Sequence, residues 1–191
     1  MFHPRWFAWI AITFMVPVCI VAHAAELEGV QLPATLEVNG ATLQLNGYGL
    51  RTYSLLGIHI YVAGLYLEHL STDPEAIIKS PETKLLTVRF EHSVTADEAR
   101  NAWREGFANN CLAPCHLDTQ DVEHFLAMVP AMHVGDNYSL LFIHRSAIVT
   151  VSGQRLGMIT EPQLAEAILA TFLGPKPASQ QLKQDLLRRH T

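Results

Sequence analysis

The dipeptide Asn39-Gly40 separates two short runs in which apolar and polar side chains alternate, residues 32–38 and 41–45. An Asn-Gly pair between such runs is the strongest local signal of a two-residue β-hairpin, because both turn positions need a positive φ angle. Further β-prone runs cover residues 50–54, 58–67, 84–92, 138–144, 147–151 and 154–159. Hairpin-linked runs of this kind predict an antiparallel sheet.

Helical patterns occur in five places between and after these runs. Asp73 and Pro74 begin a short helix that ends near Lys79, and Thr95 with Glu98 forms a capping box. Later helices are expected over residues 119–129, from a second capping box at Thr160 and Gln163, and over residues 179–189, the last on the surface. The helix after Thr95 should turn one stripe inward: Ala99, Ala102, Trp103, Gly106, Phe107 and Asn110. Strand groups with inserted helices describe one α+β domain over residues 25–191.

The first 24 residues have the composition of a secretory signal peptide. Arg5 supplies a positive charge, residues 7–22 are almost wholly apolar, and Ala22-His23-Ala24 is a small-residue cleavage site. An uncleaved membrane anchor is the alternative, but the apolar run is short for a bilayer span and Pro17 interrupts it. We therefore expect cleavage after Ala24 and an exported, periplasmic protein without a stable membrane anchor.

The composition favours a folded domain that does not bind nucleic acid. Hydrophobic residues make up 49% of the 191 residues, and 13 Lys and Arg against 18 Asp and Glu give a net charge of -5. Nucleic-acid binders usually show a basic face instead. The chain has no dinucleotide fingerprint, phosphate loop, zinc-protease motif or nucleophile elbow, and its histidines are isolated. We therefore expect neither a metal ion nor a cofactor.

Cys111 and Cys115 are the only cysteines after residue 24. An even number suits an oxidising compartment, and Pro114 should end the preceding helix and let the loop close into a disulfide. A pair of free thiols is the alternative. A metal site would recruit His116, but no second ligand pair has comparable spacing.

Residues 49–68 contain the most informative candidate site. If this stretch folds as a hairpin around residues 55–57, Ser54 faces Ile58 and Arg51 lies opposite Tyr61, with cross-strand partners about 5 Å apart. The guanidinium and the phenol could then converge on one ligand group, and the planar fork of arginine suits a carboxylate or an enolate. The alternative is a surface arginine paired with an acidic side chain.

Four motifs along the chain resemble the chalcone-isomerase superfamily. These are G-Y-G-L-R-T at residues 47–52, I-Y-V-A-G-L-Y-L-E at 60–68, A-W-R-E-G-F-A-N-N at 102–110 and F-L-G-P-K-P-A-S-Q-Q-L-K at 172–183. The last two look like its exported bacterial branch. The resemblance implies a chalcone-isomerase-like, open-faced antiparallel β-sheet with helices packed on one face.

The resemblance also implies two kinds of activity. Plant enzymes of this fold close a chalcone into a flavanone, and by motif Arg51, Asn110 and Thr171 match their catalytic Arg, Asn and late Thr. Two positions depart, since Tyr61 replaces a Thr and Trp103 replaces a Tyr. An indole N–H cannot replace a phenol as acid or acceptor. The three matching residues make an isomerase (intramolecular lyase) acting on an enone or flavonoid-like substrate one hypothesis, and the two departures count against it.

The pairing of Arg51 with Tyr61 instead resembles the fatty-acid-binding members of the superfamily, where such a pair holds the carboxylate. The leading hypothesis is therefore an exported protein that binds a fatty acid or a similar amphipathic carboxylate. The expected ligand-binding residues are Arg51, Tyr61, Trp103 and Phe107, with Leu56 and Ile168 as further walls. A third hypothesis is a non-catalytic envelope protein that binds a partner and whose pocket Tyr61 and Trp103 fill.

Overall fold

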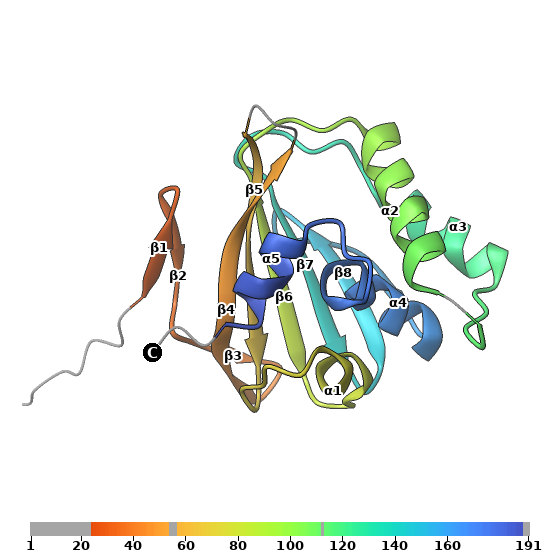
Figure 1. Ribbon diagram of the computed structural model, residues 1–191, viewed down its shortest axis with the longest axis horizontal. Coiled ribbons are helices and arrows are strands. Elements are labelled where there is room, and N and C mark those ends of the chain that lie inside the picture. The colour runs from red at the N-terminus through yellow and green to blue at the C-terminus, as the bar shows by residue number, and fades with distance from the viewer. Residues whose placement is uncertain (1–23, 54–56, 112, 189–191) are drawn as a thin grey trace, which may run out of the picture.

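The computed structural model describes residues 24–53, 57–111 and 113–188, which form a curled antiparallel half-barrel with helices against one face (Figure 1). The predicted signal peptide, apart from its last residue, and Leu56 lie outside the described residues. Seven strands pair in chain order, β3-β4-β5-β6-β7-β8-β9, and β1 pairs with β2 in a separate small sheet. Every pairing is antiparallel. The α+β prediction is therefore confirmed.

The strands are β1 (Ala25–Leu27), β2 (Val30–Leu32), β3 (Thr35–Val38), β4 (Ala41–Tyr53), β5 (Ile58–Leu67), β6 (Lys84–Phe90), β7 (Asn137–Ile143), β8 (Ser146–Val151) and β9 (Gln154–Ile159). The helices are α1 (Pro74–Lys79), α2 (Ala96–Asn110), α3 (Thr119–Ala127), α4 (Pro162–Leu173) and α5 (Gln180–Leu186).

The main hydrophobic core lies between the sheet and the helices. Each helix contributes at least one buried side chain: Ile77, Phe107, Phe125, Ile168 and Leu182. Alternate residues of the central strands face them, including Ala63, Leu65 and Leu67 of β5. A smaller cluster around Leu43, Tyr66 and Leu85 lies on the other face of the sheet. Among the described residues, no helix is long and apolar enough to cross a bilayer.

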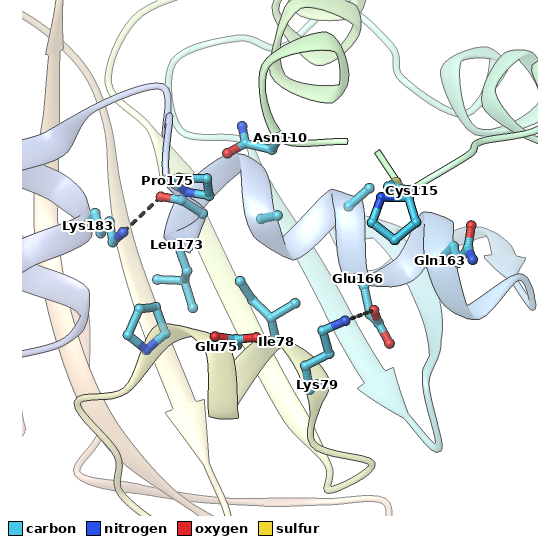
Figure 2. A pocket seen from close by; sticks show the side chains of 15 residues that line it. Glu75, Ile78, Lys79, Asn110, Cys115, Gln163, Glu166, Leu173, Pro175 and Lys183 are labelled. Atoms are coloured by element: carbon cyan, nitrogen blue, oxygen red, sulfur yellow. Dashed lines mark hydrogen bonds and ion pairs between the residues drawn. The ribbon is translucent and has the colours of Figure 1, made fainter. Parts of the chain in front are cut away.

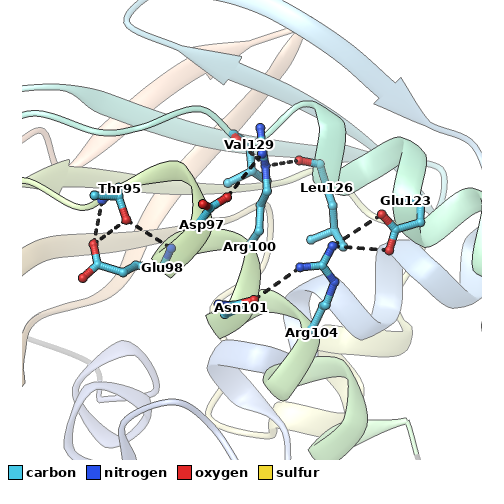
Figure 3. Close-up of polar contacts among 9 residues, drawn as sticks. All are labelled: Thr95, Asp97, Glu98, Arg100, Asn101, Arg104, Glu123, Leu126 and Val129. Atoms are coloured by element: carbon cyan, nitrogen blue, oxygen red, sulfur yellow. Dashed lines mark hydrogen bonds and ion pairs between the residues drawn. The ribbon is translucent and has the colours of Figure 1, made fainter.

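The predicted Asn39-Gly40 turn, the turn between the β-prone runs 147–151 and 154–159, and one predicted cap are found in the structure. Asn39 and Gly40 have φ angles of 52° and 81° between β3 and β4, and Ser152 and Gly153 have φ angles of 45° and 83° between β8 and β9. Both bonds of the capping box at Thr95 are present: Glu98 N–H donates to Thr95 Oγ1 at 3.2 Å, and Thr95 N–H donates to Glu98 Oε2 at 2.8 Å (Figure 3).

Two local expectations are wrong. Glu161, not Thr160, is the N-cap of α4 and makes no side-chain capping bond, since Pro162 begins the helix. Ala102 is exposed, because the inward stripe of α2 is narrower than predicted. The surface helix expected near the C-terminus is found as α5, which exposes Gln181 and Gln184 and buries Leu182 and Leu186.

Helix α5 packs directly on β4, which runs through Gly47 and Gly49 with a register shift between Leu45 and Gly47. A Cβ atom on Gly47 would lie 2.4 Å from the carbonyl oxygens of Asp185 and Leu186, so only glycine fits at this approach. Beside it, Asn46 is fully buried and its Nδ2 donates to the carbonyl of Leu186 at 2.9 Å. The G-Y-G motif therefore marks the place where the last helix meets the sheet.

Candidate functional site

The β4–β5 hairpin pairs Arg51 with Tyr61, as the sequence predicts, although the details of the turn differ. Tyr53, not Ser54, lies opposite Ile58, and Thr52 lies opposite His59. A register shift between Arg51 and Thr52 then restores the predicted pair. The extra residue in β5 is typical of a β-bulge, which re-aims side chains next to functional sites.

Arg51 and Tyr61 interact directly on the helix-covered face of the sheet. The Cζ atom of Arg51 lies 5.8 Å from the centroid of the Tyr61 ring, in cation–π range. Burial raises the pKa of Tyr61, and the charge and hydrogen bond of Arg51 offset this only in part. The phenol therefore stays protonated near neutral pH and can donate a hydrogen bond.

Arg51 has no carboxylate partner among the described residues. None of the eight ion pairs found there involves it. The predicted alternative, a surface arginine paired with an acid, is therefore not what the described residues show. The half-buried guanidinium keeps donors available for an anion from outside the chain.

Apolar side chains continue from this pair along the same face. Phe90 of β6 lies opposite Tyr61, and the two rings meet edge to face with centroids 5.6 Å apart. Tyr61 and Phe90 are both only partly buried while packing against the core, as are Ala99 and Trp103 of α2. The cationic group therefore lies beside two aromatic rings that keep some exposed surface.

The other predicted wall residues lie deeper. Trp103 stands at the centre of a ring cluster, with centroids 5.0 Å from Phe125, 5.9 Å from Phe107 and 5.9 Å from Phe172. Phe107 is 5% exposed and Ile168 is fully buried, so both belong to the core of this structure. Of the predicted walls within the described residues, only Trp103 is partly buried.

The side chains of Asn110 and Thr171 lie where α2 and α4 pack together, and both are engaged in hydrogen bonds there. Asn110 Nδ2 donates to the carbonyls of Gly106 and Lys176 at 2.9 and 2.8 Å, and its Oδ1 accepts from Lys176 N–H at 3.0 Å. Thr171 is buried and donates to the carbonyl of Ile168 at 2.7 Å, while its methyl group fills the space beside Gly106. No contact found among the described residues joins either side chain to Arg51. The structure therefore does not assemble these three residues into one site.

A groove of about 570 Å³ lies along α4 (Figure 2), and Arg51 is not among the residues that line it. Its floor includes Ala167, Ala170 and Leu173, and its rim includes Lys79, whose Nζ lies 3.5 Å from Glu166 Oε2. The disulfide of Cys111 and Cys115, with an S–S distance of 2.00 Å, borders it. The sequence carries no local signal for this groove, because its residues come from four helices and the disulfide loop.

Tyr138 of β7 is another feature that the sequence pattern did not single out. It is 5% exposed, and its hydroxyl is buried without a hydrogen-bond partner among the described residues. Within the same part of the chain, no group of three or more His, Cys, Asp or Glu side chains is arranged to hold a metal ion.

A curled antiparallel half-barrel sheet with helices on one face defines the chain as a small α+β protein. Residues 24–188 match the family model described as chalcone isomerase-like, and the chain belongs to this family. The crystal structure of a fatty-acid binding protein from Arabidopsis thaliana has the same fold, with a TM-score of 0.71 and 17% sequence identity. That match covers 86% of this chain and 96% of the plant chain. No curated protein matches the sequence.

Proposed function

We propose that this protein binds a fatty acid or a similar amphipathic carboxylate, with Arg51 and Tyr61 holding the carboxylate. The observation that carries the proposal is the half-buried guanidinium, which lies against the Tyr61 ring and has no acidic partner among the described residues. An arginine can donate two parallel hydrogen bonds to a carboxylate, and a protonated phenol can add a third.

The surroundings of this pair support an apolar chain attached to the carboxylate. Phe90, which lies opposite Tyr61, and Ala99 and Trp103 of α2 pack against the core and are only partly buried. Covering such side chains with an acyl chain would remove apolar surface from water, at about 25 cal/mol per Å². The shared fold of the plant fatty-acid binding protein supports the same class of ligand.

Export to the periplasm is part of the proposal. It rests on the composition of residues 1–24, and the disulfide of Cys111 and Cys115 is consistent with an oxidising compartment. Native mass spectrometry of protein purified from the cell envelope would give the mass of the chain. A chain that begins at Ala25 would support export, and an intact N-terminus would contradict it.

The ligand proposal is tested with the same protein by lipid analysis and by titration with a long-chain fatty acid. We expect Arg51→Ala to lose the co-purifying acyl carboxylate and to bind about 10- to 150-fold more weakly, the effect of removing a hydrogen bond to a charged group. Arg89→Ala is the matched control, because Arg89 is another half-buried strand arginine whose side chain lies on the other face of the sheet.

Equal affinity of Arg51→Ala and wild type would contradict the proposed role of Arg51. Failure of the wild type to bind any fatty acid would instead favour the partner-binding hypothesis. We do not propose the isomerase as a second function, because Asn110 and Thr171 are engaged at the α2–α4 contact.

A further inference from the structure

The hydroxyl of Tyr138 is the one buried side-chain polar atom among the described residues that has no hydrogen-bond partner. Leaving such a group unpaired costs about 1–3 kcal/mol, so a buried orphan hydroxyl calls for a physical explanation. Trp103 lies beside it, with ring centroids 6.5 Å apart. Burial raises the pKa of Tyr138, so the phenol keeps its proton and offers both a donor and an acceptor.

The sheet register places Tyr138 on the same face as the proposed carboxylate site. Tyr138 lies opposite Val88, and Val88 lies opposite Ala63, two residues along β5 from Tyr61. Two strand spacings across and two residues along correspond to roughly 12 Å between the Cα atoms of Tyr61 and Tyr138. A long-chain ligand whose carboxylate is bound at Arg51 and whose acyl chain follows the sheet past Phe90 would therefore place the middle of its acyl chain near Tyr138.

Trp103 lies beside Tyr138 and is only partly buried, although its neighbours Phe107 and Tyr138 are 5% exposed. A bound ligand that reaches the Tyr138 hydroxyl would therefore change the surroundings of the Trp103 ring. Trp103 is also the only tryptophan after residue 24, so its fluorescence would report the change.

We propose that the ligand is a long-chain acyl carboxylate with a hydroxyl or oxo oxygen near the middle of its chain, and that the Tyr138 hydroxyl hydrogen-bonds this oxygen. The inference rests on the proposed function and adds a specificity-determining residue to it. A site with a buried polar group of this kind discriminates against ligands that lack the complementary group, because they leave it unpaired.

The test compares three probes by calorimetry and Trp103 fluorescence: stearic acid, stearic acid with a hydroxyl or oxo group at mid-chain, and stearic acid with a hydroxyl beside the carboxylate. The wild type should bind the mid-chain derivative about tenfold or more tightly than the other two. Tyr138→Phe should abolish this preference and leave the affinity for stearic acid unchanged. Tyr66→Phe is the matched control, because Tyr66 is equally buried but on the other face of the sheet, and it should keep the preference.

Equal affinity of the wild type for all three probes would overturn the inference while leaving the proposed function intact. A preference that survives in Tyr138→Phe would overturn the role of Tyr138. Failure of the wild type to bind any probe would overturn the proposed function itself, and the inference with it. The comparison among probes on wild-type protein keeps the test decisive even if a variant does not fold.

Discussion

A methyl group on Gly47 would meet the backbone of α5, and a methyl group on Gly49 would lie 2.6 Å from the Cβ of Asp185. Neither residue needs glycine for its turn chemistry, since both lie inside β4. Both need it for the close approach of the last helix. The two glycines of the G-Y-G motif are therefore explained by the close packing of α5 on β4.

We therefore expect Gly47→Ala to destabilise the protein by about 1–3 kcal/mol, the usual cost of overpacking. The helix backbone cannot move away without losing the hydrogen bond from Asn46 to Leu186. Urea denaturation followed by circular dichroism measures the change. Thr52→Ala, an exposed site in the same strand, should change the unfolding free energy by less than about 0.5 kcal/mol. Similar values for the two variants would contradict the packing role.

At the residue scale, local sequence information was enough for the pair of Arg51 and Tyr61 but not for its surroundings. Cross-strand pairing depends on a short hairpin, which is a local property. The predicted register would have failed by one residue if the bulge between Arg51 and Thr52 had not compensated for the longer turn. The ring contacts of Trp103 join three helices and one strand, so no local pattern could reveal them.

Among the helices, Arg100 connects α2 to the end of α3 (Figure 3). Its Nε donates to the carbonyls of Leu126 and Val129 at 3.1 and 3.2 Å, which lie at and just after the last turn of α3. Carbonyls at a helix end lack helical partners, and a cation there also interacts favourably with the helix dipole. Arg100 thus adds a charged side-chain donor to the backbone bonds with which Met128 and Val129 N–H already cap α3.

Arg100→Ala should lower the free energy of unfolding by about 1.5–3 kcal/mol, because two carbonyls lose a charged donor. Arg104→Ala is the matched control on the same helix. Arg104 is more exposed and reaches Glu123 only at 3.4 Å, so its loss should cost less than about 1 kcal/mol. Thermal and chemical unfolding of both variants would measure the difference. A control as destabilised as Arg100→Ala would show that the cap is not the cause.

Element boundaries were predictable wherever one local interaction dominates. The capping boxes illustrate both outcomes. Thr95 and Glu98 satisfy each other and set the start of α2. Thr160 and Gln163 have the same spacing, but Pro162 fits best at the first helical position and shifts the N-cap to Glu161. Gln163 instead accepts from His116 N–H at 3.4 Å, a contact 47 residues apart in sequence.

For the molecule as a whole, one buried lysine links stability to pH. Lys84 is 4% exposed, lies on the helix side of β6 and donates to the carbonyl of Ser80 at 2.5 Å. Burial lowers its pKa from 10.5 to about 8; of its charged neighbours, Glu82, Glu166 and Glu68 act in the opposite direction, whereas Arg145 lowers it further. Between these pH values the unfolded chain holds a proton that the folded chain has released. Stability therefore rises with pH across this window.

We expect the free energy of unfolding to increase by at most about 3 kcal/mol from pH 8 toward pH 10.5. The ionisation of tyrosines opposes this rise in the free energy of unfolding at the high end of the pH range. Burial raises the pKa of Tyr66 to about 12 from 10.0, so unfolded tyrosines ionise first and stability falls above pH 10. Denaturant titrations across this pH range should show a maximum in the free energy of unfolding. Lys84→Met should remove this maximum, whereas Lys79→Met, a change at an exposed site, should keep it. An unchanged profile in Lys84→Met would assign the rise to other groups.

The fold class and most strands were predictable because alternation and turns are local, whereas the groove on α4 and the orphan hydroxyl of Tyr138 were not. Both depend on segments brought together from distant parts of the chain. The groove joins α1 to α5, more than 100 residues apart, since Glu75 and Lys183 both line it. Local propensity carries no information about contacts between segments that are so far apart in sequence.

The contact of α5 with β4 also imposes an order on biosynthesis. Asn46 and Leu186 are 140 residues apart, and the buried amide of one needs the carbonyl of the other. A ribosome finishes β4 long before it adds α5, so the part of β4 that α5 covers stays in contact with water until translation has passed residue 186. Native packing at this contact therefore becomes available only after α5 has been synthesised.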